Sequence, residues 1–338
     1  MDLDSFFTLL YVIIDDWYKA QIMKNKPKVG RPAQLTDSEV ITLAIACHWR
    51  SGVPWQSERG FIRYMLAHGK HLFPKLVNQS TFNQRSRYLY GVILQFQQVL
   101  VQWLEQPTDI YECVDLLELP AYSPGHALRQ KTHWLWQSTK GYGAHGQWFY
   151  GDWLLGSVSA SGVMTGYLIG TAQLDERWLM EAFLSMRAGC PQLQEPARKR
   201  ARGWSRASPV PCGYIGGFQA VGVKKRRPYL ADKGFNGLRW SSHWQQHYDA
   251  EVITVPFDHS KSETPWTPQA KKWHAGRRQI VETVFSVLDN VFHIKRLNAH
   301  SRWGQLTRIA CKIVGFNVGI FINRMMGRKD LSHATIIC

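Results

Sequence analysis

The chain has 338 residues, of which 45% are hydrophobic and 13% aromatic, and this composition excludes a disordered polymer and suffices for about two domains. Its 41 basic and 25 acidic residues give a formal charge of +16, which favours a polyanionic partner, most often nucleic acid, over a merely soluble basic protein. The N-terminal apolar run is broken by Asp15 and Asp16, and the run from Ile313 to Ile322 is too short for a bilayer. We therefore expect no signal peptide, no membrane partner and a cytoplasmic location.

Six cysteines form no C-x-x-C pair and no zinc motif, which favours a reduced, intracellular compartment.

Residues 1–105 are predicted to be mostly helical. Thr36 and Glu39 have the spacing of a capping box, and Ser80 is the expected cap of a later helix. Arg85 and Arg87 lie in the first turns of that later helix. A basic helical region is typical of DNA recognition by a helix-turn-helix-like unit, and a plain helical packing domain is the alternative.

The pattern changes near residue 107, and residues 106–327 are predicted to form one α/β domain followed by a tail at 328–338. A strand is expected over 110–119, and Ala160-Ser161-Gly162 predicts a hairpin. A helix capped by Asp175 and ended by Gly189 follows. This order predicts a mixed sheet with flanking helices.

Residues 190–228 have little periodicity and are predicted to form a basic surface insertion. Such a segment suits phosphate binding, and a solvated charged loop is the alternative. Its candidate DNA-binding residues are Arg198, Lys199, Arg200, Lys224, Lys225, Arg226 and Arg227.

Carboxylates occupy unusual places in this second domain. Strand interiors disfavour aspartate, so Asp115 needs an explanation, with Glu112 and Glu118 as competing candidates. Asp232 directly follows an apolar strand, where it is either a helix cap or one wall of a site. Glu282 borders the apolar stripe of a helix, and Arg278 four residues earlier offers a simple helix ion pair.

Together, these acids suggest a metal site. Asp115, Asp232 and Glu282 come from two strands and a helix, and they could converge at one edge of a sheet. Carboxylate oxygens are the ligands that Mg²⁺ prefers, and two such ions about 4 Å apart support phosphodiester chemistry.

The chain resembles DDE-type transposases of bacterial insertion sequences, from the broad group that includes the four-, five- and 982-like elements. The resemblance covers residues 5 to 328. It is carried by "YECVDLLELP", "YLADKGFNG", "RRQIVETVFSVLDNVFHIKRLNAHSRWGQLTRIACKIVGFNVGIFINR" and the N-terminal "LTDSEVITLAIACHWRSGVPWQSERGFIRYM".

The resemblance implies an RNase H-like catalytic domain with Asp115, Asp232 and Glu282 as catalytic residues and ligands of two Mg²⁺ or Mn²⁺ ions. Arg278 would contact DNA phosphate or orient Glu282. The implied activity is cutting at the element ends and joining of the 3′-OH to target DNA. The implied partners are double-stranded DNA, as terminal inverted repeats and target, and a second copy on paired ends in the nucleoid.

The chain departs from the pattern of these transposases in several places. Ala275 and Asp289 stand where relatives often have Tyr and Lys, and Trp153 and Leu155 stand where a strand often carries Lys and His. The cations that could compensate, two of which are also candidate DNA contacts, are Lys272, Arg277, Lys295 and Lys140. These losses of positive charge leave two alternatives: an inactive transposase that only binds DNA, and an RNase H-like nuclease that cleaves without joining.

Overall fold

The computed structural model describes residues 1–23, 33–122, 138–143, 146–189, 215–220, 227–256, 265–299 and 301–337. The chain divides into two compact units, a helical unit of residues 1–104 and 286–338 and a sheet unit of residues 105–285. The boundary at residue 104 lies where the predicted helical region ends. The other boundary differs from the expected domain 106–327, because residues 286–338 pack with the N-terminal helices.

Five helices form the first part of the helical unit, as far as its residues are described. They are α1 (Leu3–Gln21), α2 (Asp37–Ala46), α3 (Glu58–His68), α4 (Gln79–Tyr88) and α5 (Tyr90–Leu104). The capping box at Thr36 and Glu39 is confirmed, since each side chain bonds the other residue's backbone N–H. The expected cap at Ser80 is wrong: Asn78 accepts from the Thr81 N–H at 2.9 Å, and the chain then breaks at Leu89 into two helices.

Helix α10 (Arg302–Met325) is the central element of the helical unit, and it is buried along most of its length. It is apolar nearly all round and packs against α5 and α2, which explains why the C-terminal segment belongs to this unit. Its length and hydropathy alone would allow a membrane span, but 89% of the relevant window is buried inside the protein. Short helix η3 (His333–Thr335) follows.

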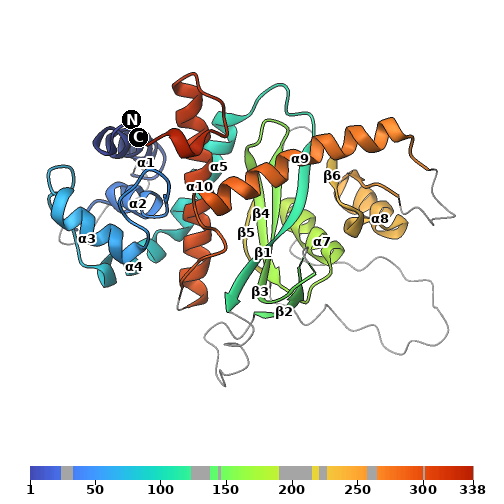
Figure 1. Cartoon of the computed structure of the whole chain (residues 1–338), viewed down its shortest axis with the longest axis horizontal. Helices are drawn as coiled ribbons and strands as arrows, with labels where there is room; N and C mark the ends of the chain where they lie inside the picture. The colour runs from blue at the N-terminus through green and yellow to red at the C-terminus, as the bar shows by residue number, and fades with distance from the viewer. Residues whose placement is uncertain are drawn as a thin grey trace. The chain divides into compact units, whose positions relative to one another are not determined.

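The described part of the sheet unit contains seven strands. They are β1 (Glu112–Tyr122), β2 (Thr139–Tyr142), β3 (Trp148–Ser159), β4 (Met164–Thr171), β5 (Ile215–Ala220), β6 (Tyr229–Ala231) and β7 (Val252–Ile253). The order is β5-β4-β3-β1-β6-β7, with β2 paired to β3. Strands β1, β3, β4 and β5 pair antiparallel, whereas β6 and β7 run parallel to β1. The predicted mixed α/β class is therefore confirmed (Figure 1).

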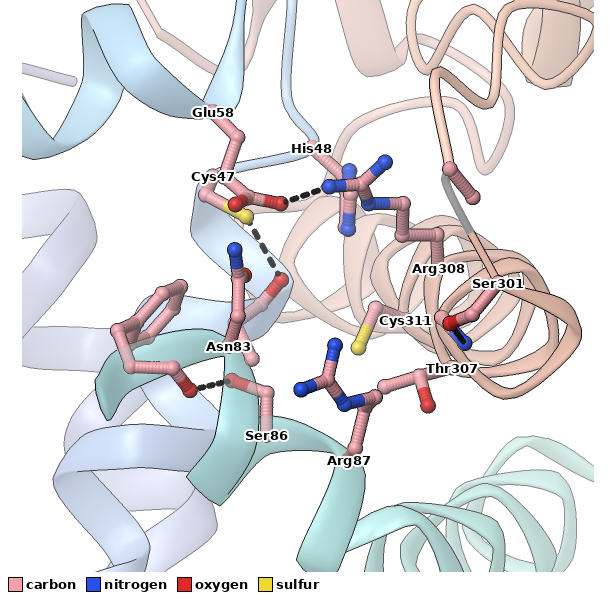
Figure 2. A pocket seen from close by; sticks show the side chains of 14 residues that line it. Cys47, His48, Glu58, Asn83, Ser86, Arg87, Ser301, Thr307, Arg308 and Cys311 are labelled. Carbon is pink, nitrogen blue, oxygen red and sulfur yellow. Dashed lines mark hydrogen bonds and ion pairs between the residues drawn. The ribbon is translucent and has the colours of Figure 1, made fainter. Parts of the chain in front are cut away.

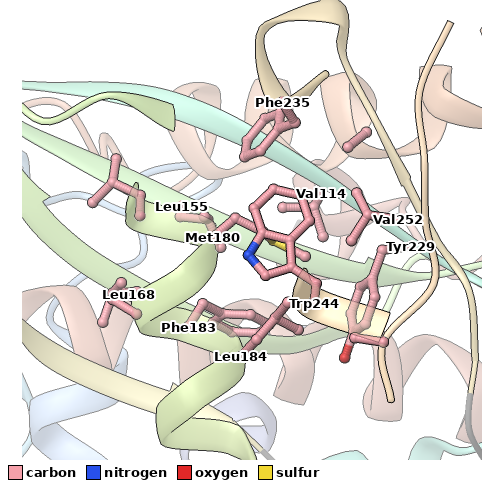
Figure 3. Packing of buried hydrophobic residues seen from close by; sticks show 14 of the residues in the cluster. Val114, Leu155, Leu168, Met180, Phe183, Leu184, Tyr229, Phe235, Trp244 and Val252 are labelled. Atoms are coloured by element: carbon pink, nitrogen blue, oxygen red, sulfur yellow. The ribbon is translucent and has the colours of Figure 1, made fainter. Parts of the chain in front are cut away.

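Helices α7 (Glu176–Arg187) and α8 (Leu238–Tyr248) cover one face of this sheet. Their side chains pack with Val114, Leu155 and Leu168 around the fully buried Trp244, as Figure 3 shows. The hairpin between β3 and β4 and the Asp175 cap of α7 are present as predicted.

Helix α9 (Pro268–Asn290) packs against the opposite face, through residues up to Phe285. The Cys113 thiol of β1 donates to the Arg277 carbonyl at 3.4 Å. Gly156 allows this approach, because a Cβ there would lie 2.8 Å from the Phe285 ring. Successive residues of a strand point to opposite faces, so β1 directs Val114 toward α7 and Asp115 toward α9.

Candidate active site

Asp115 and Asp232 meet at the parallel pair of β1 and β6. The register aligns Val114 with Ala231, so the next residue of each strand is an aspartate on the side of α9. Arg278 of α9 donates to Asp115 Oδ2 at 2.7 Å and to Asp232 Oδ1 at 3.1 Å. The structure therefore brings three of the four predicted catalytic residues into direct contact.

Glu282 lies one helical turn beyond Arg278 and is exposed. Its charge contributes to the raised pKa of Asp115, which places it near the other carboxylates. The simple helix ion pair is not found among the described residues, because the guanidinium of Arg278 turns to the two aspartates.

Asp232 precedes the short helix η2 (Lys233–Phe235), but its side chain forms no capping hydrogen bond. Its side chain is 56% exposed and contacts Arg278 instead. The interpretation of Asp232 as a helix cap is therefore wrong, and a position in the wall of a site fits the geometry.

Burial raises the pKa of the Asp115 carboxyl, and the charges of Asp232 and Glu282 raise it further. Arg278 and the Leu116 N–H, which donates to Asp115 Oδ1 at 2.8 Å, act in the opposite direction without cancelling the shift. The protein thus keeps a carboxylate where its charged form is costly, a pattern that is enriched at functional sites.

Glu176 is a fourth carboxylate of this region that the sequence analysis missed. Burial raises its pKa to about 7, with contributions from Asp175, Asp232 and Asp115. Its carboxylate lies over Gly234, where an added Cβ would be 1.3 Å from Oε2, so the glycine makes room for it. An acid in the first turn of a helix is common because it is favourable near the helix N-terminus. Glu176 therefore gave no sign in the sequence that it lies near the two aspartates.

The donor chemistry of these residues suits Mg²⁺, but their arrangement does not form a metal site. Among the described residues, no three acidic, histidine or cysteine side chains gather closely enough to hold an ion. The Arg278 guanidinium already bridges Asp115 and Asp232 where a cation would otherwise stand between them. An ion could be held there only after Arg278 released at least one carboxylate.

The competing acids of β1 have other surroundings. Glu112 is fully buried in an ion pair with Arg187 at 2.8 Å, on the face covered by α7. Glu118 lies against Gly143, where a Cβ would meet its carboxylate. Asp115 is therefore the acid of this strand that reaches Arg278.

The predicted DNA-binding residues are dispersed. Arg85 pairs with Asp37 at 2.7 Å, Arg227 pairs with Glu105, and Lys272 and Arg277 are exposed on α9. Arg87 lines a pocket of the helical unit. The remaining candidates lie outside the described residues: Arg198, Lys199, Arg200, Lys224, Lys225 and Arg226.

The positions that depart from the transposase pattern have structural surroundings of their own. Ala275 is exposed on α9, and Asp289 lies 4.0 Å from Lys295 in the helical unit. The Trp153 indole donates to the Ala172 carbonyl at 3.0 Å and packs against the sheet core, where Leu155 is buried.

Comparisons with protein-family models, curated proteins and solved structures found no match.

Proposed function

We propose that the sheet unit is the catalytic part of a DNA transposase of the insertion-sequence type, which cuts element ends and joins the 3′-OH to target DNA. The observation that carries the proposal is the meeting of Asp115, inside β1, with Asp232 and Arg278 at the point where the parallel strand β6 ends, with Glu282 one turn away. Asp115 and Asp232 are 117 positions apart in the chain, and Glu282 follows Asp232 by 50 positions. A site composed of residues this far apart in sequence depends on the fold to bring them near one another.

The fold and the charge support this proposal. A mixed sheet with helices on both faces is compatible with the RNase H-like fold that the resemblance implies. A formal charge of +16 suits a phosphate backbone, and Lys272 and Arg277 are exposed on the helix that carries Arg278. A homodimer on paired element ends, in the cytoplasm at the nucleoid, belongs to the same proposal.

The proposed chemistry uses Mg²⁺ or Mn²⁺, two ions by resemblance, which would activate the attacking oxygen and stabilise the leaving one. The residues to hold them are Asp115, Asp232 and Glu282. Because Arg278 bridges two of these in the present arrangement, the ion-bound form requires the guanidinium to turn toward another anion. A DNA phosphate is such an anion, and arginine binds it well.

The test is strand cleavage of DNA that carries the repeats flanking the gene, with Mg²⁺, Mn²⁺ or EDTA. We expect metal-dependent breaks that leave 3′-OH ends, and their loss in Asp232→Asn with DNA binding largely kept. Glu251→Gln is the matched control, because this exposed carboxylate of the same unit lies outside the site. Equal loss of binding and cleavage in Asp232→Asn would contradict a role in the chemistry.

The second candidate is an inactive transposase that acts as a DNA-binding protein, and the Arg278 bridge favours it. If the guanidinium permanently neutralises both aspartates, the protein binds element ends without cutting them under any metal. Cleavage without joining would instead indicate another kind of RNase H-like nuclease.

A further inference from the structure

The helical unit contains a pocket of about 260 Å³ among α2, α3, α4 and the start of α10 (Figure 2). The function proposed for the sheet unit does not involve it. Most of its wall comes from the C-terminal end of α2, one face of α4 and the first three turns of α10. The residues on its wall include Cys47, His48, Glu58, Asn83, Arg87 and Arg308.

The charges on this wall are unbalanced. Glu58 is the sole carboxylate among the lining residues, and Arg308 donates to it at 2.7 Å. Arg87 therefore adds a positive charge for which the wall supplies no counter-charge. Its guanidinium forms no ion pair with a described residue, and Figure 2 shows it between Ser86 and Cys311. A half-buried, unpaired guanidinium facing a cavity favours an anion.

Two basic side chains lie behind the wall. The guanidinium of Arg50 reinforces this field, whereas burial lowers the pKa of Lys312 to about 7, so its ammonium is only partly charged at neutral pH. Among the described residues, Arg50 and Lys312 donate to backbone carbonyls and not to carboxylates: Arg50 reaches Trp49 O at 2.9 Å, and Lys312 reaches His293 O at 2.6 Å. Burial lowers the pKa of His48 well below its ordinary value, and Lys312, Arg50 and Arg308 lower it further. The pocket thus has a positive potential and a neutral imidazole.

His48 supplies an observation independent of charge. Its side chain is 5% exposed, lines the pocket, and forms no hydrogen bond with a described residue. Because His48 borders the pocket, a ligand bound there could form the hydrogen bond that this ring lacks with the described residues. The start of α10, where Ser301 caps the Gly304 N–H at 3.1 Å, adds the positive end of a 24-residue helix.

We propose that this pocket binds the phosphate of a nucleotide, with Arg87 as its main anchor and Asn83 and His48 as hydrogen-bonding partners. Its volume lies just below the about 300 Å³ of pockets that enclose whole small ligands, so the phosphate and its neighbouring atoms enter and the rest stays outside. A free mononucleotide and a nucleotide of a DNA strand present the same chemistry.

The experiment is titration of the full chain by calorimetry with deoxyadenosine 5′-monophosphate, deoxyadenosine, and short duplex DNA. We expect the monophosphate to bind and deoxyadenosine to bind at least tenfold more weakly. Arg87→Gln should weaken binding of the monophosphate about tenfold or more, the effect of losing a charged hydrogen bond. Arg63→Gln is the matched control, because this exposed arginine of the same unit lies outside the pocket.

The DNA arm distinguishes the two sources. If Arg87→Gln weakens the binding of duplex DNA but the monophosphate does not bind, the pocket takes a phosphate of the DNA strand. If the monophosphate binds in an Arg87-dependent way and DNA binding is unchanged, the ligand is a free nucleotide. Both results support the pocket.

Three results would overturn it: equal binding of deoxyadenosine and its monophosphate, no binding by any probe, or equal loss in Arg87→Gln and Arg63→Gln. If Arg87→Gln does not fold, as judged by circular dichroism, Asn83→Leu replaces it. This variant keeps the charge and removes a hydrogen-bonding group, and a monophosphate affinity unchanged from wild type would then count against the pocket.

Discussion

Strand β1 carries an arginine–carboxylate cluster on each of its faces, and the two clusters differ in how completely their polar atoms are paired. On the α7 side, Glu112 is 0% exposed, and its carboxylate accepts hydrogen bonds from both terminal nitrogens of Arg187, at 2.8 and 3.1 Å. Its carboxylate also accepts hydrogen bonds from Ser157 and from Thr165, the latter at 2.8 Å. On the α9 side, Arg278 holds two aspartates, one of them largely exposed, and its buried Nε has no hydrogen bond to a described residue.

This difference distinguishes a buried cluster that supports the fold from a partly exposed cluster that is open to a ligand. Every oxygen of Glu112 is used, so this cluster can do nothing further without unfolding. The cluster around Arg278 has an exposed carboxylate and a neighbouring Glu282, and in the proposed function its arginine exchanges one of these anions for a DNA phosphate. Both clusters consist of an arginine and carboxylates, and they differ in how completely their polar atoms are paired.

Breaking the internal cluster should have the largest effect on stability. Glu112→Gln leaves the buried Arg187 charge without its counter-ion, and we expect the free energy of unfolding in urea at pH 7 to fall by about 3–5 kcal/mol. Replacing both residues, with Glu112→Leu and Arg187→Met, should recover part of this loss because no charge stays buried. A single-variant loss below about 1 kcal/mol would show that the pair is not buried as described.

The sequence indicated that Asp115 and Asp232 could meet, but the residue pattern alone left Glu112 and Glu118 as competitors of Asp115, and only the resemblance selected Asp115. Strand ends and turn signals are local, and they correctly placed Asp232 directly after β6, whereas Asp115 lies inside β1 between β3 and β6. Glu112 and Asp115 are equally unusual in a strand, and what separates them is Arg187, 75 residues away from Glu112. The alternative of a helix ion pair between Arg278 and Glu282 was wrong for a similar reason. Helical spacing pointed to Glu282, but the fold places Asp115 and Asp232 within ion-pair distance of Arg278.

The same limit explains the domain boundary. The apolar circumference of α10 predicts burial correctly, but it contains no information on which unit buries it. The partners, α2 and α5, end at Ala46 and Leu104, far earlier in the chain than the start of α10 at Arg302.

The stability from Glu112 should depend on pH in the acid range. Burial alone would raise the pKa of Glu112, but Arg187, Ser157 and Thr165 outweigh it and hold the pKa below its ordinary value of 4.5. A lowered folded-state pKa contributes stability that is complete above about pH 4.5 and is lost as the pH falls through the folded value. The difference in unfolding free energy between wild type and Glu112→Gln should therefore stay constant from pH 8 to 5 and shrink below pH 4.

The cluster on the α9 side can be opened without breaking the fold. Arg278→Gln removes the positive charge between Asp115 and Asp232, so we expect Mn²⁺ to bind about tenfold more tightly, as followed by the electron paramagnetic resonance of free Mn²⁺. Arg239→Gln, an exposed arginine on α8, is the control for the change in net charge. If both variants bind Mn²⁺ as wild type does, the guanidinium does not occupy a cation position.

Asp115→Asn should have the smallest effect on stability, and with the opposite sign to Glu112→Gln. Because the pKa of Asp115 is raised above its ordinary value of 3.8, its charged form destabilises the folded protein at neutral pH. The amide removes that cost while losing one contact to Arg278, so unfolding free energy at pH 7 should be unchanged or up to about 1 kcal/mol higher. Any gain should disappear as the pH falls below 3.8, where the wild-type carboxyl is protonated in both states. A loss of more than about 1 kcal/mol at pH 7 would place Asp115 with Glu112 as an internal support and remove the contrast between the two faces of β1.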